Sequence, residues 1–286
     1  SVWWNERGHG IHVVGGEFEL LFDKVFGTIA GWSWQGTTIL RGGPKLSFWR
    51  APTDNDRGFG MPMEREWRAS GLHWLQHRVE AVEGVELKEK AVRITVTSRI
   101  APPVFDKMFA CDTTYTIYGT GDLIIEAHGV PRGEWPKVLP RIGLQIALPA
   151  ELDRVSWYGR GPGESYADSK EANRVGVYAT TVDGLYTPYA FPQENGNRTD
   201  TRWAAFTNLR GMGLMAQGDP VMNFSAHWFT PEDLDKAAHT YELKKRDFIT
   251  LNLDHRQSGL GSASCGPGPL EKYWLKPEEF RFRMRL

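Results

Sequence analysis

The densest group of polar side chains lies in the segment WRAPTDNDRG, residues 49–58. In an extended backbone, Asp54 and Asp56 would project to one side with their Cα atoms roughly 6–7 Å apart. Two carboxylates at about that separation are what a glycosidase needs. Asp-Asn-Asp before Gly is also common turn chemistry, and beside Arg57 both carboxylates would stay ionised, which leaves no proton donor. We therefore expect Asp54 and Asp56 to bind sugar hydroxyls or to order the loop.

Three further segments could contact a ligand. Residues 160–166 contain glycines but lack the Lys-Ser/Thr that a phosphate-binding loop requires, so we expect a rigid connection. Residues 186–196 form a stiff loop whose Glu194 and Asn195 either bind hydroxyls or satisfy their own backbone. Residues 259–269 are small enough to let the backbone approach a ligand closely. Cys265 has no neighbouring base to activate its thiol, so we interpret it as a contact residue.

Charge and residue types exclude several classes of function. The 34 basic and 35 acidic residues nearly cancel, which argues against nucleic acid and against a basic membrane-binding face. The eight histidines are scattered, and neither cysteine has a partner at zinc-ligand spacing, so we expect no metal in this chain. No Gly-x-Ser-x-Gly elbow is present. We expect no membrane segment and, with two cysteines and no apolar signal core, a cytoplasmic protein.

The elements that must position these residues are mostly strands. Residues 91–97 alternate apolar and polar side chains, and residues 113–118 and 123–127 flank a short Gly-containing turn, which predicts a hairpin. Residues 18–23 and 27–32 predict a second strand pair. Helices are expected over residues 63–70 and from a cap at Thr230, with apolar positions continuing at helical spacing to Tyr241. This pattern favours antiparallel sheets packed face to face.

Size and tryptophan content refine this picture. At 286 residues the chain is long for one domain, but large all-β sandwiches reach this length. We find no repeat or linker and expect a single domain over residues 1–286. The 12 tryptophans either pack a large β core or offer faces on which sugars stack.

Taken in order, four segments resemble the C-terminal domain of the large β-galactosidases of glycoside hydrolase family two. In some bacteria this region is a separate small chain. The segments are residues 49–58, WYGRGPGESY at 157–166, YTPYAFPQENG at 186–196, and residues 259–266. The resemblance covers Val2 to Leu286, and several of its motifs are long.

The resemblance implies an all-β supersandwich of the galactose mutarotase type, with antiparallel sheets and a few short helices. It implies a role in the hydrolysis of terminal β-galactosides such as lactose. In the family, the two catalytic glutamates and the Mg²⁺ ligands lie in a barrel domain that this chain lacks. We therefore expect no catalytic residue and no cofactor here, and a partner in a catalytic barrel domain or large subunit. The isolated chain should be inactive.

The resemblance also implies which residues complete the sugar pocket. The segment of Asp54, Asn55 and Asp56 would face the galactose site, and Gly58 would be the hinge of a mobile loop over residues 57–62. Glycine suits a hinge because it accepts large dihedral changes. Cys265 stands near the place where some family members have a Trp, which puts aromatic stacking there in doubt.

Two other functions remain open. An aldose 1-epimerase would share the fold and would need a glutamate base and a histidine acid in one cleft, for which Glu194 and His227 are candidates. A stand-alone carbohydrate-binding module would grip sugars with exposed Trp rings. No epimerase motif is present in the sequence.

Overall fold

The computed structural model describes residues 1–58, 61–88, 90–262 and 266–286, and strands dominate it. The helices are short: α1 (Met63–Ala69), α2 (Val182–Leu185) and α3 (Pro231–Lys236), with single 3₁₀ turns at Leu72–Trp74, Lys170–Ala172, Thr240–Glu242 and Glu271–Tyr273. The strands are β1 (Trp3–Arg7), β2 (Gly10–Val14), β3 (Phe18–Asp23), β4 (Thr28–Trp34), β5 (Thr37–Leu40), β6 (Gly42–Ser47), β7 (Gln76–Leu87), β8 (Ala91–Ala101), β9 (Met108–Tyr118), β10 (Leu123–Arg132), β11 (Arg141–Pro149), β12 (Arg154–Gly161), β13 (Arg174–Thr181), β14 (Arg198–Thr207), β15 (Gly213–His227), β16 (Phe248–Gln257) and β17 (Phe280–Arg285).

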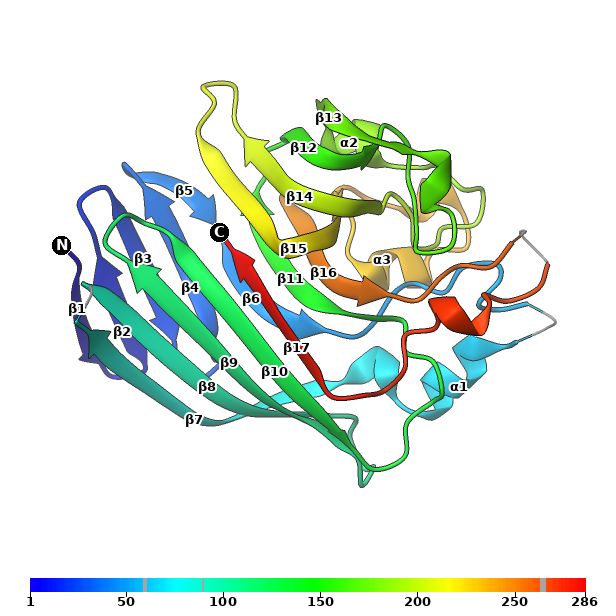
Figure 1. Cartoon of the computed structure of the whole chain (residues 1–286), viewed down its shortest axis with the longest axis horizontal. Helices are drawn as coiled ribbons and strands as arrows, with labels where there is room; N and C mark the ends of the chain where they lie inside the picture. The colour runs from blue at the N-terminus through cyan, green and yellow to red at the C-terminus, as the bar shows by residue number, and fades with distance from the viewer. Residues whose placement is uncertain (59–60, 89, 263–265) are drawn as a thin grey trace.

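The strands pair antiparallel throughout and form a strongly curled sheet (Figure 1). One run of neighbours leads from β7 through β8, β9, β10 and β17 to β15. From the long strand β15, one branch continues through β16, β11, β6, β4, β3 and β2 to β1, and the other through β14 and β12 to β13. The expected antiparallel all-β architecture with few short helices is confirmed.

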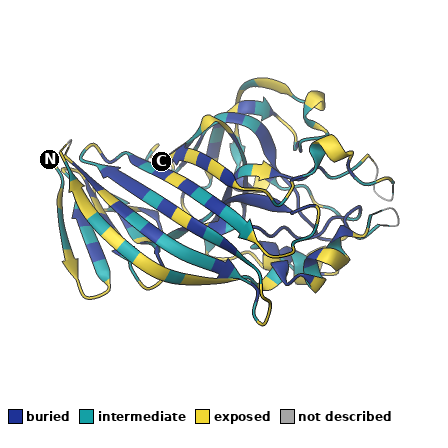
Figure 2. Ribbon diagram, turned by 60° about the horizontal axis from the view of Figure 1, so that its bottom comes forward, coloured by how far each residue is buried: buried dark blue, intermediate teal, exposed yellow. Residues whose placement is uncertain are grey.

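Alternating side chains build the core between the walls of this curled sheet. Buried and exposed positions alternate along most strands, as Figure 2 shows. Strand β16 is an exception, because it lies between β11 and β15 and six consecutive residues from Ile249 to Asp254 are buried. The tryptophans differ in burial: Trp32, Trp49, Trp67 and Trp157 are buried in the core, whereas Trp3 and Trp74 are more than half exposed.

Both predicted strand pairs form. Residues 113–118 and 123–127 lie in β9 and β10, which pair with Leu123 opposite Ile117. Residues 18–23 and 27–32 lie in β3 and β4. Helix α1 confirms the helix expected at 63–70. Helix α3 begins at Pro231 with the expected Thr230 cap, but the expectation that it continues to Tyr241 is wrong, since Ala237 is extended.

His255 in β16 gives a pH-dependence prediction. Its ring stacks on Phe282 at 5.2 Å between centroids, and burial lowers the pKa of His255 to about 4. The pKa of His255 is lower in the folded chain than its ordinary value of about 6.5. The contribution of neutral His255 to the unfolding free energy is therefore fully present above about pH 6.5 and is lost as the pH falls toward 4. We expect His255→Gln to reduce the loss of unfolding free energy between pH 7 and pH 5 by roughly 1 kcal/mol.

Urea unfolding at both pH values measures this difference. His9→Gln is the matched control, because His9 is exposed in the turn between β1 and β2. Equal pH sensitivity of the His255 variant and the native chain would contradict the assignment.

Candidate functional site

Four loops meet at the end of the sheet opposite β1–β5 (Figure 1). They are residues 48–58 after β6, residues 162–173 after β12, residues 186–197 after α2, and residues 258–262 after β16. Each of these loops contains described residues of one of the four segments singled out from the sequence. Two buried clusters of charged side chains connect them.

Arg50 anchors the first loop. Its guanidinium donates to both carboxylate oxygens of Asp56, at 3.0 and 2.7 Å, and both side chains are completely buried. The same guanidinium donates to the backbone carbonyls of Ser258 (2.6 Å) and Gly259 (3.2 Å) and lies over the Trp67 ring. Arg50 therefore joins the loop 48–58 to the loop 258–262.

Asp56 is enclosed by this arrangement. Besides the two bonds from Arg50, one carboxylate oxygen accepts the Thr53 N–H at 2.9 Å, while the Asp56 N–H donates to the Thr53 hydroxyl at 3.3 Å. This is the local turn chemistry considered from the sequence. Asp56 is thus placed to order the loop.

Asp54 and Asn55 belong to the same turn, and Asn55 is buried. Asp54 is half-buried, and the Gln193 amide both accepts its N–H and donates to its carboxylate, each at 3.1 Å. Asn55 donates to the Leu260 carbonyl at 2.9 Å. Gly58 is half-buried and its N–H donates to the Asn55 carbonyl at 3.1 Å. Asp54 is therefore the carboxylate of this segment that a ligand can reach.

The loop 258–262 is held from a second side. The Asp168 carboxylate accepts the N–H groups of Leu260 (3.1 Å) and Gly261 (2.7 Å). Gly261 has φ of 97° and approaches the Asn55 amide so closely that a Cβ would lie 2.8 Å from it. A larger residue would not fit there. The predicted contact residue Cys265 lies outside the described residues.

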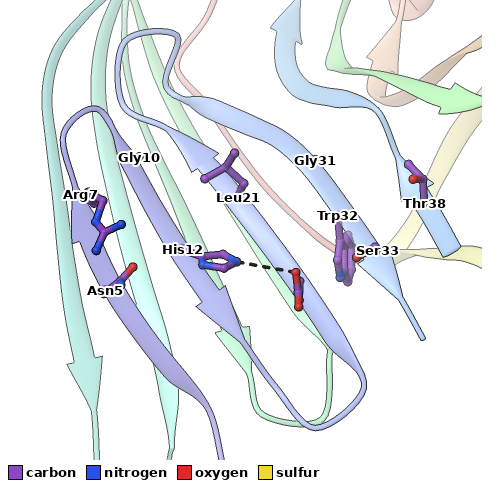
Figure 3. A pocket seen from close by; sticks show the side chains of 10 residues that line it. Asn5, Arg7, Gly10, His12, Leu21, Gly31, Trp32, Ser33 and Thr38 are labelled. Carbon is purple, nitrogen blue, oxygen red and sulfur yellow. Dashed lines mark ion pairs between the residues drawn. The ribbon is translucent and has the colours of Figure 1, made fainter. Parts of the chain in front are cut away.

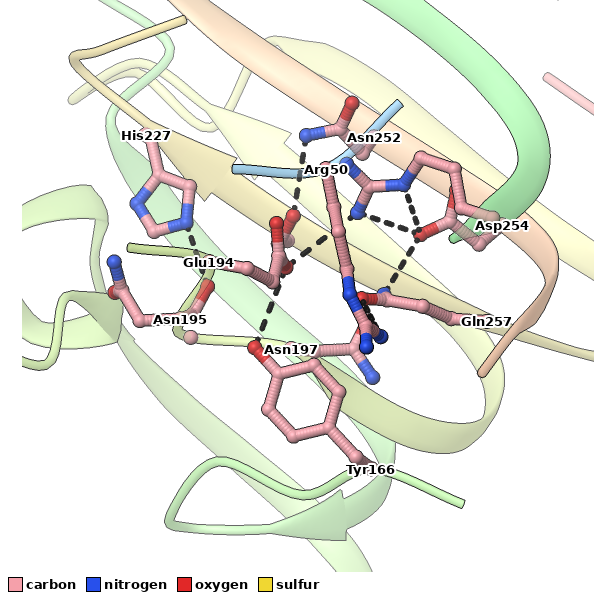
Figure 4. A network of polar contacts seen from close by, with 12 residues as sticks. Arg50, Tyr166, Glu194, Asn195, Asn197, His227, Asn252, Asp254 and Gln257 are labelled. Atoms are coloured by element: carbon pink, nitrogen blue, oxygen red, sulfur yellow. Dashed lines mark hydrogen bonds and ion pairs between the residues drawn. The ribbon is translucent and has the colours of Figure 1, made fainter. Parts of the chain in front are cut away.

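The second cluster is centred on Arg141, which is completely buried. Figure 4 shows Asp254, Glu194 and Tyr166 of this network. Its guanidinium donates to Asp254 at 3.0 Å, to Glu194 at 3.4 Å and to the Trp49 carbonyl at 3.2 Å. Burial raises the pKa of Asp254 to about 6, with Arg141 opposing the rise. The contribution of protonated Asp254 to the unfolding free energy is therefore fully present below the ordinary carboxyl pKa and is lost as the pH rises through about 6.

Glu194 and His227, the candidate epimerase pair, belong to this buried cluster. Glu194 accepts the Tyr166 hydroxyl at 3.3 Å in addition to Arg141. The His227 Nε2 bonds to the Asn195 carbonyl at 2.8 Å, and burial lowers the pKa of His227. Both side chains are only 3% exposed. They are therefore closed off from a sugar in this conformation.

The loop 186–197 is held in place by hydrogen bonds to the neighbouring loops as well as by bonds within itself. The Gly196 N–H donates to Glu164 at 2.7 Å, and the Tyr189 hydroxyl also bonds to Glu164. The Glu194 N–H donates to the Ala51 carbonyl at 3.0 Å. The loop is thereby tied to residues 162–173 and to residues 48–58.

Sequence reasoning found the loops but missed the side chains that join them. Arg50 and Arg141 each join two of the loops, Asp254 pairs with Arg141, and Gln193 positions Asp54. Arg50 lies inside a recognised motif, but its partners Ser258 and Gly259 stand about 200 residues away in the chain. Within the described residues, no group of three or more His, Cys, Asp or Glu side chains is arranged to hold a metal ion.

Comparison with known proteins identifies the family of the chain. A family model described as the beta galactosidase small chain matches residues 14–286. The chain belongs to the β-galactosidase small-chain family. The part of the chain described here contains no helix with the length and apolar character needed to cross a membrane.

Relatives of known name agree with this family. The chain is 33% identical over 250 residues to a β-galactosidase of Priestia megaterium, covering 87% of this chain and 23% of that protein. It is 32% identical over 290 residues to a β-galactosidase of Kluyveromyces lactis, covering 99% of this chain and 27% of that protein. The chain thus spans about a quarter of the length of these relatives.

A comparison with solved structures identifies the fold. The chain superposes on a structure described as an aldose 1-epimerase from Escherichia coli with a TM-score of 0.50 and 11% sequence identity, covering 100% of this chain and 98% of that one. At this identity the likeness concerns the fold alone. The expected galactose mutarotase-like fold is confirmed.

Proposed function

We propose that the chain completes the sugar pocket of a β-galactosidase whose remaining part supplies the catalytic glutamates and the Mg²⁺ site. The observation that carries the proposal is the coverage: relatives named β-galactosidase match 87% and 99% of the chain with only about a quarter of their own length. The partner is then a catalytic barrel domain or large subunit, and the substrate is a terminal β-galactoside. The expected single domain and cytoplasmic location stay predictions.

The loop cluster supports this division of labour. A retaining glycosidase needs two carboxyl groups about 5–5.5 Å apart around one bond. In the segment 54–56, Asp56 is closed in by Arg50, which leaves Asp54 as a lone reachable carboxylate. A lone ionised carboxylate can accept hydrogen bonds from sugar hydroxyls but supplies no acid–base pair. In our proposal Asp54 and Asn55 contact the sugar, and Gly58 is the hinge of the loop 57–62, of which residues 59–60 lie outside the described residues.

The fixed positions of these loops suit a binding surface that the chain supplies to a partner. Arg50 and Asp168 hold the backbone of residues 258–261, and Gln193 holds Asp54. A loop that is already ordered before the ligand binds loses less conformational entropy on binding. The proposal that Cys265 contacts the sugar substrate rests on the resemblance alone.

A hydrolysis assay tests the proposal. The purified chain should not hydrolyse o-nitrophenyl galactoside, whereas mixing it with a β-galactosidase portion that lacks the matched region should restore hydrolysis. Turnover by the chain alone would refute the proposal. The epimerase alternative is tested by following the optical rotation of α-galactose, for which we expect the uncatalysed rate because Glu194 and His227 are buried.

A further inference from the structure

The N-terminal strands β1–β5 have an outer face that lies away from the four loops of the candidate site, here called the loop cluster. The pairing register assigns side chains to this face. Asn5 stands opposite His12, His12 opposite Leu21, and Leu21 opposite Gly31. Because neighbours directly opposite one another share a face, this row points away from the core. In the same strands, residues such as Ile11, Val13, Leu20 and Phe22 are completely buried on the other face.

This outer face is hollowed. Figure 3 shows the depression, which has a volume of about 590 Å³. That size lies within the range of small-molecule sites. Polar side chains from five strands line it: Asn5, Arg7, His12, Glu19, Ser33 and Thr38.

A strand glycine, Gly31, leaves room for a ligand at the hollow. Gly10 and Gly31 both line it. A Cβ built on Gly31 would meet no atom within 4 Å, so the space above this strand position is open. Gly31 also lacks the positive φ that would make a side chain strained there. A side chain at this position would enter the hollow without disturbing the fold.

The chemistry of the lining matches a neutral polyhydroxyl compound. The charge of Arg7 is balanced by that of Glu19, which lies 3.9 Å from His12. Amide, guanidinium and hydroxyl groups supply donors, and the carboxylate supplies an acceptor. A phosphate or nucleic-acid site would instead show an excess of cations. The exposed Leu21 also lines the hollow, but a protein interface would have few charges at its centre, whereas Arg7 and Glu19 both line this one.

An exposed aromatic ring stands beside the hollow. Trp3 is 55% exposed, and its ring packs edge-on against His12 at 6.3 Å between centroids. Trp3 lies two residues before Asn5 in β1 and therefore on the same face. Its open apolar surface is suited to the C–H face of a sugar ring.

We propose that this hollow is a binding site for a neutral saccharide, separate from the loop cluster. It lies at the end of the molecule opposite those loops (Figure 1). Polar groups of Asn5, Arg7 and Glu19 bind the hydroxyls, and Trp3 stacks on the ring. The site does not require the catalytic part of a β-galactosidase, so it stands or falls independently of the proposed function.

Amide NMR spectra of the full chain titrated separately with lactose, cellobiose and maltose test the proposal. We expect at least one sugar to shift the amides of Gly10, His12 and Gly31 to saturation. Gly31→Val should weaken this binding at least about tenfold. The matched control is Gly42→Val, since Gly42 is a strand glycine whose added Cβ also meets no atom within 4 Å but which does not line the hollow.

Three results would overturn the proposal. The first is no shift at these amides with any of the sugars. The second is equal affinity of Gly31→Val and the native chain. The third is loss of the shifts when the catalytic portion is added, because the face would then be an interface. Shifts confined to residues 51–58 would support the proposed function while leaving the hollow without a ligand, so the two proposals fail separately.

Discussion

Replacing Arg50 with methionine is expected to lower the unfolding free energy of the chain by about 3–5 kcal/mol, the cost of leaving a buried charge without its partner. Arg50 and Asp56 are both completely buried, and no solvent compensates the carboxylate when the guanidinium is removed. The substitution also deprives the carbonyls of Ser258 and Gly259 of their donor. Urea unfolding measures the loss.

The control for this variant is Arg281→Met. Arg281 is 71% exposed in β17 and pairs with Glu279 at 3.5 Å, and exposed pairs contribute about 0–1 kcal/mol. The double variant Arg50→Met, Asp56→Leu should be more stable than Arg50→Met alone, because no unpaired charge remains. A loss below about 1 kcal/mol in Arg50→Met would contradict the anchoring role assigned to this pair.

Replacing Asp54 with asparagine should impair the assembled enzyme without unfolding the chain. The substitution keeps the size of the side chain and removes the charge that we propose to accept sugar hydroxyls. Hydrogen bonds to charged groups contribute about 1.5–3 kcal/mol, so kcat/KM for a galactoside should fall roughly 10–100-fold. The midpoint of urea unfolding should stay close to that of the native chain, because asparagine keeps a side-chain oxygen that can accept the bond from the Gln193 amide.

Asp122→Asn is the matched control for catalysis. Asp122 lies in the turn before β10, pairs with the exposed Arg285, and is far along the sheet from the loop cluster. It should leave kcat/KM unchanged. Equal kinetics of the Asp54 and Asp122 variants would show that Asp54 does not contact the substrate. A lowered unfolding midpoint in Asp54→Asn would instead indicate a structural role through Gln193.

The strands were predictable because their signal is local. Residues 91–97 alternate with a period of two, and this pattern alone defines the face of β8 that enters the core. The end of α3 was not predictable in this way. A helix of six residues is marginal by itself. Leu234 of this helix packs in one buried cluster with Phe229, which directly precedes the cap, and with Ala51, which lies far away in the chain.

The site was predictable only as a set of loops. Asp54 and Asn55 stood out as a polar cluster, but nothing in the sequence distinguished the enclosed Asp56 from the reachable Asp54. That difference comes from Arg50 and Gln193, whose contacts span the fold. Arg141 and Asp254 are lone charges in strand-like segments 113 residues apart, and only the pairing of β11 with β16 brings them together.

Titration of a catalytic β-galactosidase portion, lacking the matched region, with this chain tests most directly whether the loops serve a partner's chemistry. We predict that neither component hydrolyses o-nitrophenyl galactoside alone, and that activity rises with added chain to a plateau at one chain per catalytic portion. The Asp54→Asn chain should reach a lower plateau at the same stoichiometry. Full activity of the catalytic portion without the chain, or hydrolysis by the chain by itself, would contradict the account.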